Sequence, residues 1–195
     1  MEKKAAVFLD RDGTINEEVG YLDRAEKLKI IPAAFEAIRL INQSGLEAVV
    51  VSNQAGVAKG LFTESFVQEI NGLIQNALSE KGARIDAFYF CPHHPTEGSA
   101  PYRTICTCRK PAAGLLHQAA ADRNIDLAQS YVIGDRLRDV ETAHRAGAKG
   151  VLVATGYGQD VIANGGQDAP NELNTPDAIA QDILEAVRWI LKDRP

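Results

Sequence analysis

The sequence VFLDRDGT at residues 7–14 organises this chain. The apolar run over 5–9 predicts a buried strand, which leads into two carboxylates, Asp10 and Asp12, and a turn that Gly13 allows. Because side chains alternate along an extended chain, both carboxylates can point the same way. Their repulsion is relieved by a cation between them or by a proton held on one of them. The pair indicates a metal-assisted nucleophile beside a general acid/base, although Asp and Gly after a strand also suit an ordinary turn.

The composition is that of an ordinary globular protein. Of the 195 residues, 45% are hydrophobic and 24% charged, which is enough material for one sizeable core, so we expect a single domain over 1–195. No run approaches the ~18 apolar residues of a transmembrane helix, and the N-terminus lacks a signal-peptide pattern, so we expect a cytoplasmic protein. The net charge of -5 weighs against nucleic acid or an anionic membrane as the main partner. We expect a monomer that acts on a small molecule.

Apolar runs and helical periodicities alternate along the chain. The predicted strands are at 5–9, 46–51, 86–90, 130–133 and 151–154. The predicted helices run from Pro32 to Gly45, from an N-cap at Thr63 to Gly82, over 112–123, over 142–146 to Gly147, and from Thr175 and Pro176 onward. We expect a loop over 156–176, and a last helix that docks Ile179 and Ile183 on the sheet. This pattern predicts an α/β fold whose parallel sheet is covered on both faces.

Polar side chains stand where predicted strands end, which is where open α/β sheets bind ligands. Ser52 and Asn53 end the second predicted strand, and Asp135 follows the fourth. Between them in the chain, Arg109 and Lys110 place two cations side by side, which suits a phosphate group. Each feature alone is more simply a loop cap or a solvated basic pair. It is the order of the features that indicates a site.

In that order, the runs DRDGT, VVVSNQ, CRKP and IGD resemble the four motifs of the haloacid dehalogenase (HAD) superfamily of phosphatases, over essentially the whole chain. The resemblance implies a HAD-like Rossmannoid three-layer sandwich with a mainly parallel sheet and a minimal cap. It implies that Asp10 attacks phosphorus to form an aspartyl-phosphate and that Asp12 is the general acid/base. It also implies that Ser52 and Lys110 stabilise the phosphoryl group.

The same resemblance implies a catalytic Mg²⁺. Its ligands would be the carboxylates of Asp10 and Asp135 and the backbone carbonyl of Asp12, a set of hard oxygen atoms that suits this ion. Asp139 has two interpretations that the sequence leaves even. Its carboxylate can hold a metal-bound water, or it can sit in the first turn of the next helix, where an acid is favoured by the helix dipole.

A second metal site is predicted in the segment 91–108. All three cysteines of the chain, Cys91, Cys106 and Cys108, fall there together with His93, and three thiolates and one imidazole form a closed tetrahedral Zn²⁺ set. No position is left for water, so we expect a structural Zn²⁺ that pins a long loop. His94 is the spare histidine, either an alternative ligand or a group that faces the substrate. The alternative is a polar loop that binds no metal, with a lone histidine and with cysteines buried as small apolar residues.

The spacing C-x-H-x12-C-x-C resembles the zinc loop of one HAD branch, which includes sugar-bisphosphate phosphatases and histidinol-phosphate phosphatases. With a minimal cap, selectivity must come from loops. The candidate substrate contacts are Glu18, Val19, Gly20, Tyr21, Ser52, Asn53, Gln54, Ala55, Arg109, Lys110 and Arg136.

Three functions remain open at this point. The resemblance favours a phosphatase for a sugar bisphosphate, and Arg109 and Arg136 would suit the second phosphate if both lie near the far end of the substrate. A histidinol-phosphate phosphatase is the alternative, with Glu17 or Glu18 as partner of the substrate amine. The third is a non-catalytic, zinc-stapled binding module with the HAD fold, which the intact catalytic motifs argue against.

Overall fold

The structure is a computed structural model that describes residues 3–164 and 171–194. One sheet of six strands has the order β3–β2–β1–β4–β5–β6, and every neighbouring pair is parallel. The strands are β1 Ala6–Leu9, β2 Glu47–Asn53, β3 Ala87–Cys91, β4 Tyr131–Gly134, β5 Lys149–Val153 and β6 Ala178–Ala180. In register, Leu9 lies opposite Val50 on one side and Ile133 on the other. The carboxyl ends of β1, β2 and β4 therefore open at one edge of the sheet.

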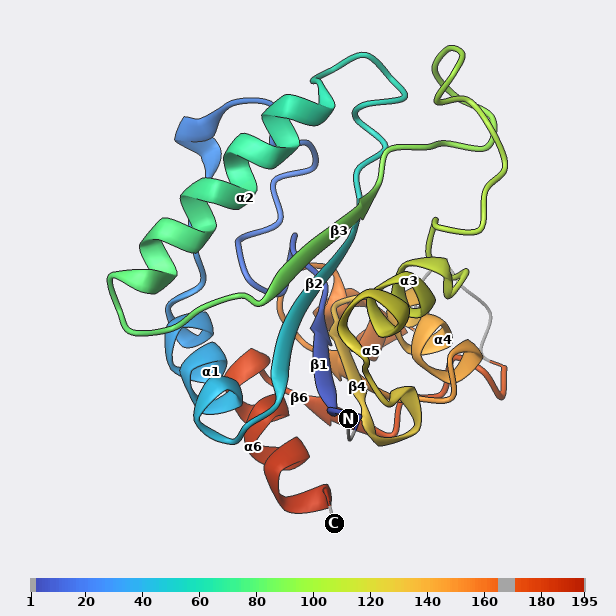
Figure 1. Cartoon of the computed structure of the whole chain (residues 1–195). Coiled ribbons are helices and arrows are strands. Elements are labelled where there is room, and N and C mark those ends of the chain that lie inside the picture. Colours follow the sequence, from blue (N-terminus) through green and yellow to red (C-terminus); the bar gives the residue numbers. More distant parts are fainter. Residues whose placement is uncertain (1–2, 165–170, 195) are drawn as a thin grey trace.

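Helices cover both faces of the sheet (Figure 1). They are α1 Pro32–Gln43, α2 Glu64–Ser79, α3 Gly114–Arg123, α4 Leu137–Arg145, α5 Gly158–Asn164 and α6 Ile183–Asp193, with short 3-10 turns at Ala25–Lys27 and Leu127–Gln129. Helices α1, α2 and α6 pack on one face of the sheet and share a hydrophobic core with it, and α3, α4 and α5 lie on the other face. The predicted α/β fold is thus confirmed as a three-layer sandwich.

The central strand β1 explains the continuous apolar run in the sequence. Val7 and Leu9 belong to the core under α1 and α6, whereas Ala6 and Phe8 belong to the core under α3. All of them are fully buried. A strand with helices on both sides needs an apolar residue at every position, which removes the polar alternation of a half-exposed strand.

The C-terminal part differs from the prediction. The predicted loop over 156–176 contains α5, whose Val161 packs on the core of Leu137, Val140 and Leu152, while 165–170 lie outside the described residues. The last helix does not begin at Thr175, because Asp182 caps it by accepting hydrogen bonds from Leu184 and Glu185 N–H.

The residues before that cap form the edge strand β6. Ile179 lies in β6 and is 57% exposed, so its predicted packing in the last helix was wrong. A three-residue strand and a seven-residue helix are too short to show a clear hydrophobic period.

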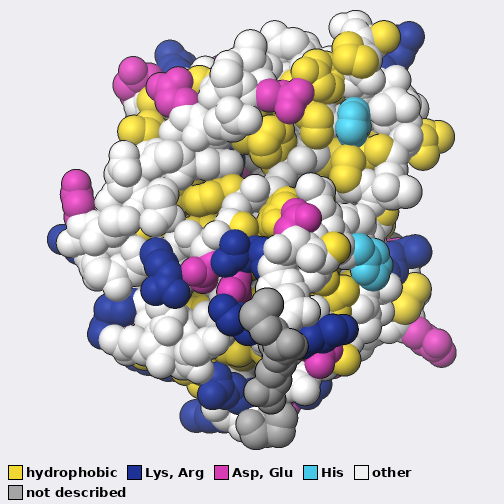
Figure 2. All heavy atoms as spheres, in the orientation of Figure 1, with side chains coloured by type: hydrophobic (Ala, Val, Ile, Leu, Met, Phe, Trp, Pro, Cys, Tyr) yellow, Lys and Arg dark blue, Asp and Glu magenta, His cyan; other side chains and the backbone are white. Residues whose placement is uncertain are grey.

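The surface is mixed in charge. Figure 2 shows basic and acidic side chains interleaved over the lower half of one face. Among the ion pairs, Glu47 at the start of β2 binds both Lys4 and Arg123.

Among the described residues, no helix combines the length and the apolar character needed to cross a membrane.

Candidate active site

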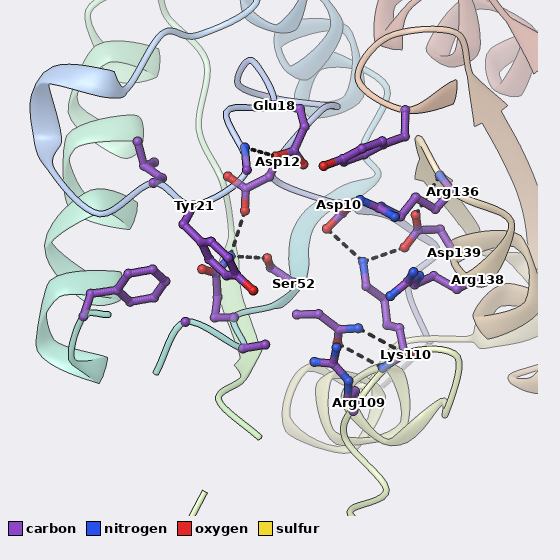
Figure 3. A pocket seen from close by; sticks show the side chains of 18 residues that line it. Asp10, Asp12, Glu18, Tyr21, Ser52, Arg109, Lys110, Arg136, Arg138 and Asp139 are labelled. Atoms are coloured by element: carbon purple, nitrogen blue, oxygen red, sulfur yellow. Dashed lines mark hydrogen bonds and ion pairs between the residues drawn. The ribbon is translucent and has the colours of Figure 1, made fainter. Parts of the chain in front are cut away.

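Most of the predicted site residues meet at a pocket of about 250 Å³ at the carboxyl edge of the sheet (Figure 3). Those that line it are Asp10, Asp12, Glu18, Gly20, Tyr21, Ser52, Asn53, Gln54, Ala55, Arg109, Lys110 and Arg136. Val19 does not line it and is 38% exposed. Asp135 does not line the pocket either; it is fully buried and lies next to the lining residues Asp10 and Asp139.

Lys110 lies at the floor of the pocket between two carboxylates. Its Nζ is 2.8 Å from Asp10 Oδ1 and 2.6 Å from Asp139 Oδ1, and it donates a hydrogen bond to the Val51 carbonyl at 2.9 Å. Burial alone would lower the pKa of Lys110, but the charges of Asp10 and Asp139 raise it above its ordinary value. Burial raises the pKa of Asp10 to about 6 although Lys110 opposes this shift.

Asp12 has a different environment from Asp10. Its carboxylate accepts hydrogen bonds from the buried Arg11, from Asn16 Nδ2 at 2.9 Å and from Gln54 Nε2 at 2.8 Å. Burial favours the neutral acid, but Arg11 and these amides outweigh burial and hold the pKa of Asp12 below its usual range. The two carboxylates of the first motif thus lie in one pocket, but their surroundings raise the pKa of Asp10 and lower the pKa of Asp12.

The turn that follows Asp10 is built by backbone hydrogen bonds. Asp10 N–H donates to the Ile133 carbonyl at 2.9 Å, which ties the end of β1 to β4. The Arg11 carbonyl then accepts from both Ile15 and Asn16 N–H, and Gly13 adopts a φ of 85° inside this turn. A side chain at that φ would be strained, which explains the glycine.

Asp10, Asp135 and Asp139 form a carboxylate cluster whose ligand atoms lie within 4.8 Å of one another. Asp135 Oδ2 accepts from Tyr157 N–H at 2.8 Å, whereas the buried Oδ1 has no hydrogen-bond partner. Burial, and after it the charges of Asp10 and Asp139, raise the pKa of Asp135 to about 8. Three buried carboxylates and an unpaired oxygen are a fitting set for a hard divalent cation such as Mg²⁺.

Space around Asp135 is kept open by two glycines. A Cβ at Gly13 or at Gly156 would lie 2.2 Å from Asp135 Oδ2. The side chain of Asp12 is outside the cluster. Asp139, which the sequence left between two interpretations, is both in the cluster and at the helix start, where its Oδ2 accepts from Arg136 N–H at 3.1 Å.

Ser52, Asn53 and Gln54 connect the end of β2 to the rest of the site. Gln54 Nε2 donates to Ser52 Oγ at 2.7 Å. Asn53 Nδ2 donates to the Lys110 carbonyl at 3.1 Å, and Lys110 N–H donates back to Asn53 Oδ1 at 3.0 Å. This reciprocal pair places the lysine against β2 although the two residues are far apart in the sequence.

The four predicted zinc ligands also meet. The Cys91 and Cys108 sulfurs are 3.1 Å apart, Cys106 is 3.3 Å from Cys108, and His93 Nδ1 is 3.3 Å from Cys108. Ligands of a tetrahedral Zn²⁺ with Zn–S bonds of ~2.3 Å are separated by roughly 3.8 Å, so this donor set fits the ion with a small expansion. Cys91 ends β3, and the other three residues lie in the long connection between β3 and α3, which Figure 1 shows as a loop.

His94 belongs neither to the cluster of Cys91, His93, Cys106 and Cys108 nor to the pocket lining. Its Nδ1 accepts from Glu97 N–H at 2.9 Å and from Thr96 N–H at 3.4 Å, so it supports its own turn. The His93 carbonyl instead accepts from Arg109 Nη1 at 3.0 Å. The loop that carries the thiols therefore also holds a pocket arginine.

Sequence reasoning missed five further pocket residues, which are Leu22, Gly56, Phe62, Arg138 and Tyr157. Figure 3 shows Arg138 on the same side of the pocket as Arg109 and Arg136. The sequence does contain a signal for Arg138. A cation in the first turn of a helix is unfavourable for the helix dipole and suggests that an anionic ligand binds there. Tyr157 and Phe62 lie in loops and follow no pattern that points to a site.

Comparison with known proteins gives a consistent result. Residues 107–186 match a family model described as HAD-hydrolase-like. The chain is 41% identical over 191 residues to the D-glycero-D-manno-heptose-1,7-bisphosphate 7-phosphatase of Thermosynechococcus vestitus, covering 96% of this chain and 95% of that protein. It is 40% identical to the D-glycero-beta-D-manno-heptose-1,7-bisphosphate 7-phosphatase of Escherichia coli K12, covering 97% and 95%.

Solved structures agree with these relatives. The D,D-heptose 1,7-bisphosphate phosphatase from B. bronchiseptica, complexed with magnesium and phosphate, superposes with a TM-score of 0.83 at 30% identity. The match covers 97% of this chain and 99% of that one. The homologous enzyme from Burkholderia thailandensis gives a TM-score of 0.68 at 28% identity.

Proposed function

This chain belongs to the HAD-like hydrolases, in the family of the D-glycero-D-manno-heptose-1,7-bisphosphate 7-phosphatases, and from that premise we propose that it removes the 7-phosphate of D-glycero-D-manno-heptose 1,7-bisphosphate. It is a phosphoric monoester hydrolase whose substrate is a small phosphorylated sugar. The product would be a heptose 1-phosphate, a precursor on the way to ADP-heptose.

One observation carries the substrate proposal. The pocket has a carboxylate nucleophile beside a lysine at its floor, Asp10 and Lys110, and three guanidinium groups on one wall. The floor suits the reacting phosphate, and the wall suits a second anion at the far end of the molecule. A cationic amine at that end, as in histidinol phosphate, would face arginines, so the alternative substrate is not favoured.

In the proposed mechanism Asp10 is the nucleophile and Asp12 is the general acid and base. An oxygen of Asp10 bonds to phosphorus as the bond from phosphorus to the C7 oxygen breaks, and Asp12 gives its proton to that departing oxygen. Asp12 then takes a proton from the water that attacks the aspartyl-phosphate, which releases phosphate and frees Asp10. The hydrogen bonds from Arg11, Asn16 and Gln54 orient Asp12 for both proton transfers. These donors lower the pKa of Asp12, whereas the negative charge of a phosphoryl group beside it would raise this pKa.

Lys110 and Ser52 would stabilise charge on the phosphoryl oxygens, since both side chains reach the pocket floor from fixed positions. We propose that Asp10, Asp135 and the backbone carbonyl of Asp12 hold Mg²⁺, with Asp139 beside them. When bound, the ion offsets the negative charge shared by nucleophile and substrate. We propose a structural Zn²⁺ on Cys91, His93, Cys106 and Cys108, a set that would keep Arg109 in place through the His93 carbonyl.

The test compares Mg²⁺-dependent phosphate release from D-glycero-D-manno-heptose 1,7-bisphosphate, as separate α and β anomers, and from L-histidinol phosphate. We expect kcat/KM to favour the bisphosphate by at least about a hundredfold, because only it has an anion for the arginine wall. Asp10→Asn should abolish turnover in a folded protein. A ratio in favour of histidinol phosphate would overturn the substrate, and appreciable activity of Asp10→Asn would overturn the nucleophile.

Further expectations stay predictions. They are a single domain over 1–195, a monomer, no nucleic-acid or membrane partner, and a cytoplasmic location. Light scattering during size-exclusion chromatography measures the oligomeric state, and fractionation of the producing cell measures the location.

A further inference from the structure

Tyr157, in the connection between β5 and α5, contacts two neighbouring residues of the site. Its ring lies under the guanidinium of Arg136, with Arg136 Cζ at 3.5 Å from the ring centroid. Its backbone N–H donates to Asp135 Oδ2 at 2.8 Å. Tyr157 and Arg136 both line the pocket. One tyrosine thus joins the buried carboxylate cluster to the arginine wall.

The stack leaves the binding edge of Arg136 unused. A guanidinium on an aromatic ring uses its face, and its N–H groups point outward in the plane, where they can bind an anion in pairs. Within the described part of the chain, no carboxylate forms an ion pair with the Arg136 side chain. Its donors are therefore available to a ligand.

This lack of a partner is unexpected in an acidic neighbourhood. Arg136 lies close enough to Glu18 and Asp135 for its charge to act on both: burial raises the pKa of each carboxyl group, and the charge of Arg136 lowers it. A mobile guanidinium would be drawn to these carboxylates. The ring of Tyr157 supplies a competing contact that keeps the arginine at the pocket wall.

The backbone that carries the Tyr157 ring is constrained by the flanking residues. Gly156 has a φ of 56°, and a Cβ at Gly158 would lie 1.7 Å from the Val153 carbonyl oxygen. Thr155 Oγ1 donates to the Gly13 carbonyl at 2.6 Å. The connection therefore passes close to the first motif, and its backbone conformation sets the direction in which the Tyr157 side chain leaves the chain.

We propose that Tyr157 is a positioning residue for substrate specificity: its ring presents the Arg136 guanidinium to the phosphate group farther from the reacting one. This proposal rests on the proposed function, because it requires a substrate with two phosphates. The backbone contact to Asp135 is independent of the side chain, so substitutions at 157 test the stack separately from the carboxylate cluster.

The experiment compares two substrates, heptose 1,7-bisphosphate and heptose 7-phosphate, which lacks the second phosphate. Tyr157→Leu should raise KM for the bisphosphate about tenfold, with kcat within about twofold of wild type, and leave KM for the monophosphate unchanged. Tyr157→Phe keeps the ring and should behave as wild type with both. Tyr157→Met provides a second side chain without a ring if the leucine variant does not fold.

A double-mutant cycle tests whether Tyr157 acts through Arg136. Arg136→Gln should also raise KM for the bisphosphate, and Tyr157→Leu added to it should have no further effect. Equal changes with both substrates, additive effects in the cycle, or a Phe variant as weak as the Leu variant would overturn the positioning role. A wild-type enzyme that releases no phosphate from the bisphosphate, or treats both substrates alike, would instead overturn the proposed function and this inference with it.

Discussion

The guanidinium of Arg11 binds the carboxylate of its neighbour Asp12 through two nitrogens. Nη2 lies 2.9 Å from Oδ2 and 3.1 Å from Oδ1, and Nε lies 3.3 Å from Oδ1. Arg11 is only 2% exposed, and its Nη1 also donates to Asn71 of α2 at 3.4 Å. The orientation of the proposed acid/base is therefore set from inside the core by the residue between the two aspartates.

This contact predicts the effect of Arg11→Lys. A lysine keeps the charge but cannot form the fork, so Asp12 loses its fixed orientation. We expect kcat to fall about ten- to hundredfold with KM nearly unchanged, because misplacing a reacting group costs rate rather than binding. Steady-state kinetics measure this. Arg39→Lys is the matched control, since Arg39 makes a similar paired contact with Glu36 on α1, outside the pocket. Unchanged kcat in Arg11→Lys would contradict the orienting role.

The carboxylate cluster predicts a magnesium-dependent gain in stability. Mg²⁺ binds the folded state and should raise Tm of the wild type with increasing concentration. Asp135→Asn removes one carboxylate of the cluster and should abolish most of this response, whereas Asp126→Asn, outside the cluster, should keep it. Thermal unfolding at a series of Mg²⁺ concentrations provides the measurement. An Asp135→Asn protein with the full response would exclude this aspartate as a ligand.

The two adjacent histidines predict opposite effects on zinc content. His93→Gln should lower bound zinc well below one ion per chain, and KM should rise at least about tenfold because Arg109 loses its anchored partner. His94→Gln should retain zinc, since the His94 side chain accepts hydrogen bonds from Thr96 and Glu97 of its own turn. Elemental analysis of the purified proteins decides the assignment. Loss of zinc in His94→Gln with retention in His93→Gln would reverse it.

Glu47 predicts a pH-dependent stability. Burial favours its neutral form, but Arg123 and Lys4 together hold the pKa of Glu47 below its ordinary value of 4.5. A lowered pKa in the folded state means that the contribution to stability is present above about pH 4.5 and is lost as the pH falls through the folded pKa.

Glu47→Gln should therefore reduce the free energy of unfolding by about 1 to 2 kcal/mol at pH 7, with a difference that shrinks in acid. Glu36→Gln, which breaks an exposed pair on α1, should cost less than about 0.5 kcal/mol. Denaturant unfolding at pH 7 and near pH 4 supplies the comparison. A loss in Glu47→Gln that is independent of pH would rule out the ion pairs as its source.

The sequence by itself determined the frame of the site. Asp10, Ser52 and Asp135 each follow a buried apolar run, and parallel strands bring their carboxyl ends to one edge whatever the details of packing. The cluster of Cys91, His93, Cys106 and Cys108 was equally predictable, because three cysteines and a histidine within one short segment are typical of a metal site. Such signals are local: they depend on residue type and on spacing along a few residues.

Only the tertiary structure decided what depends on contacts between distant segments. It separated His93 from the adjacent His94, brought Asp139 into the carboxylate cluster, and placed Tyr157 under Arg136. It also revealed β6 and α5, which are too short to carry a period of their own and form because they pack on β5. In each case the deciding free energy comes from side chains that meet in space, and no pattern along the chain records it.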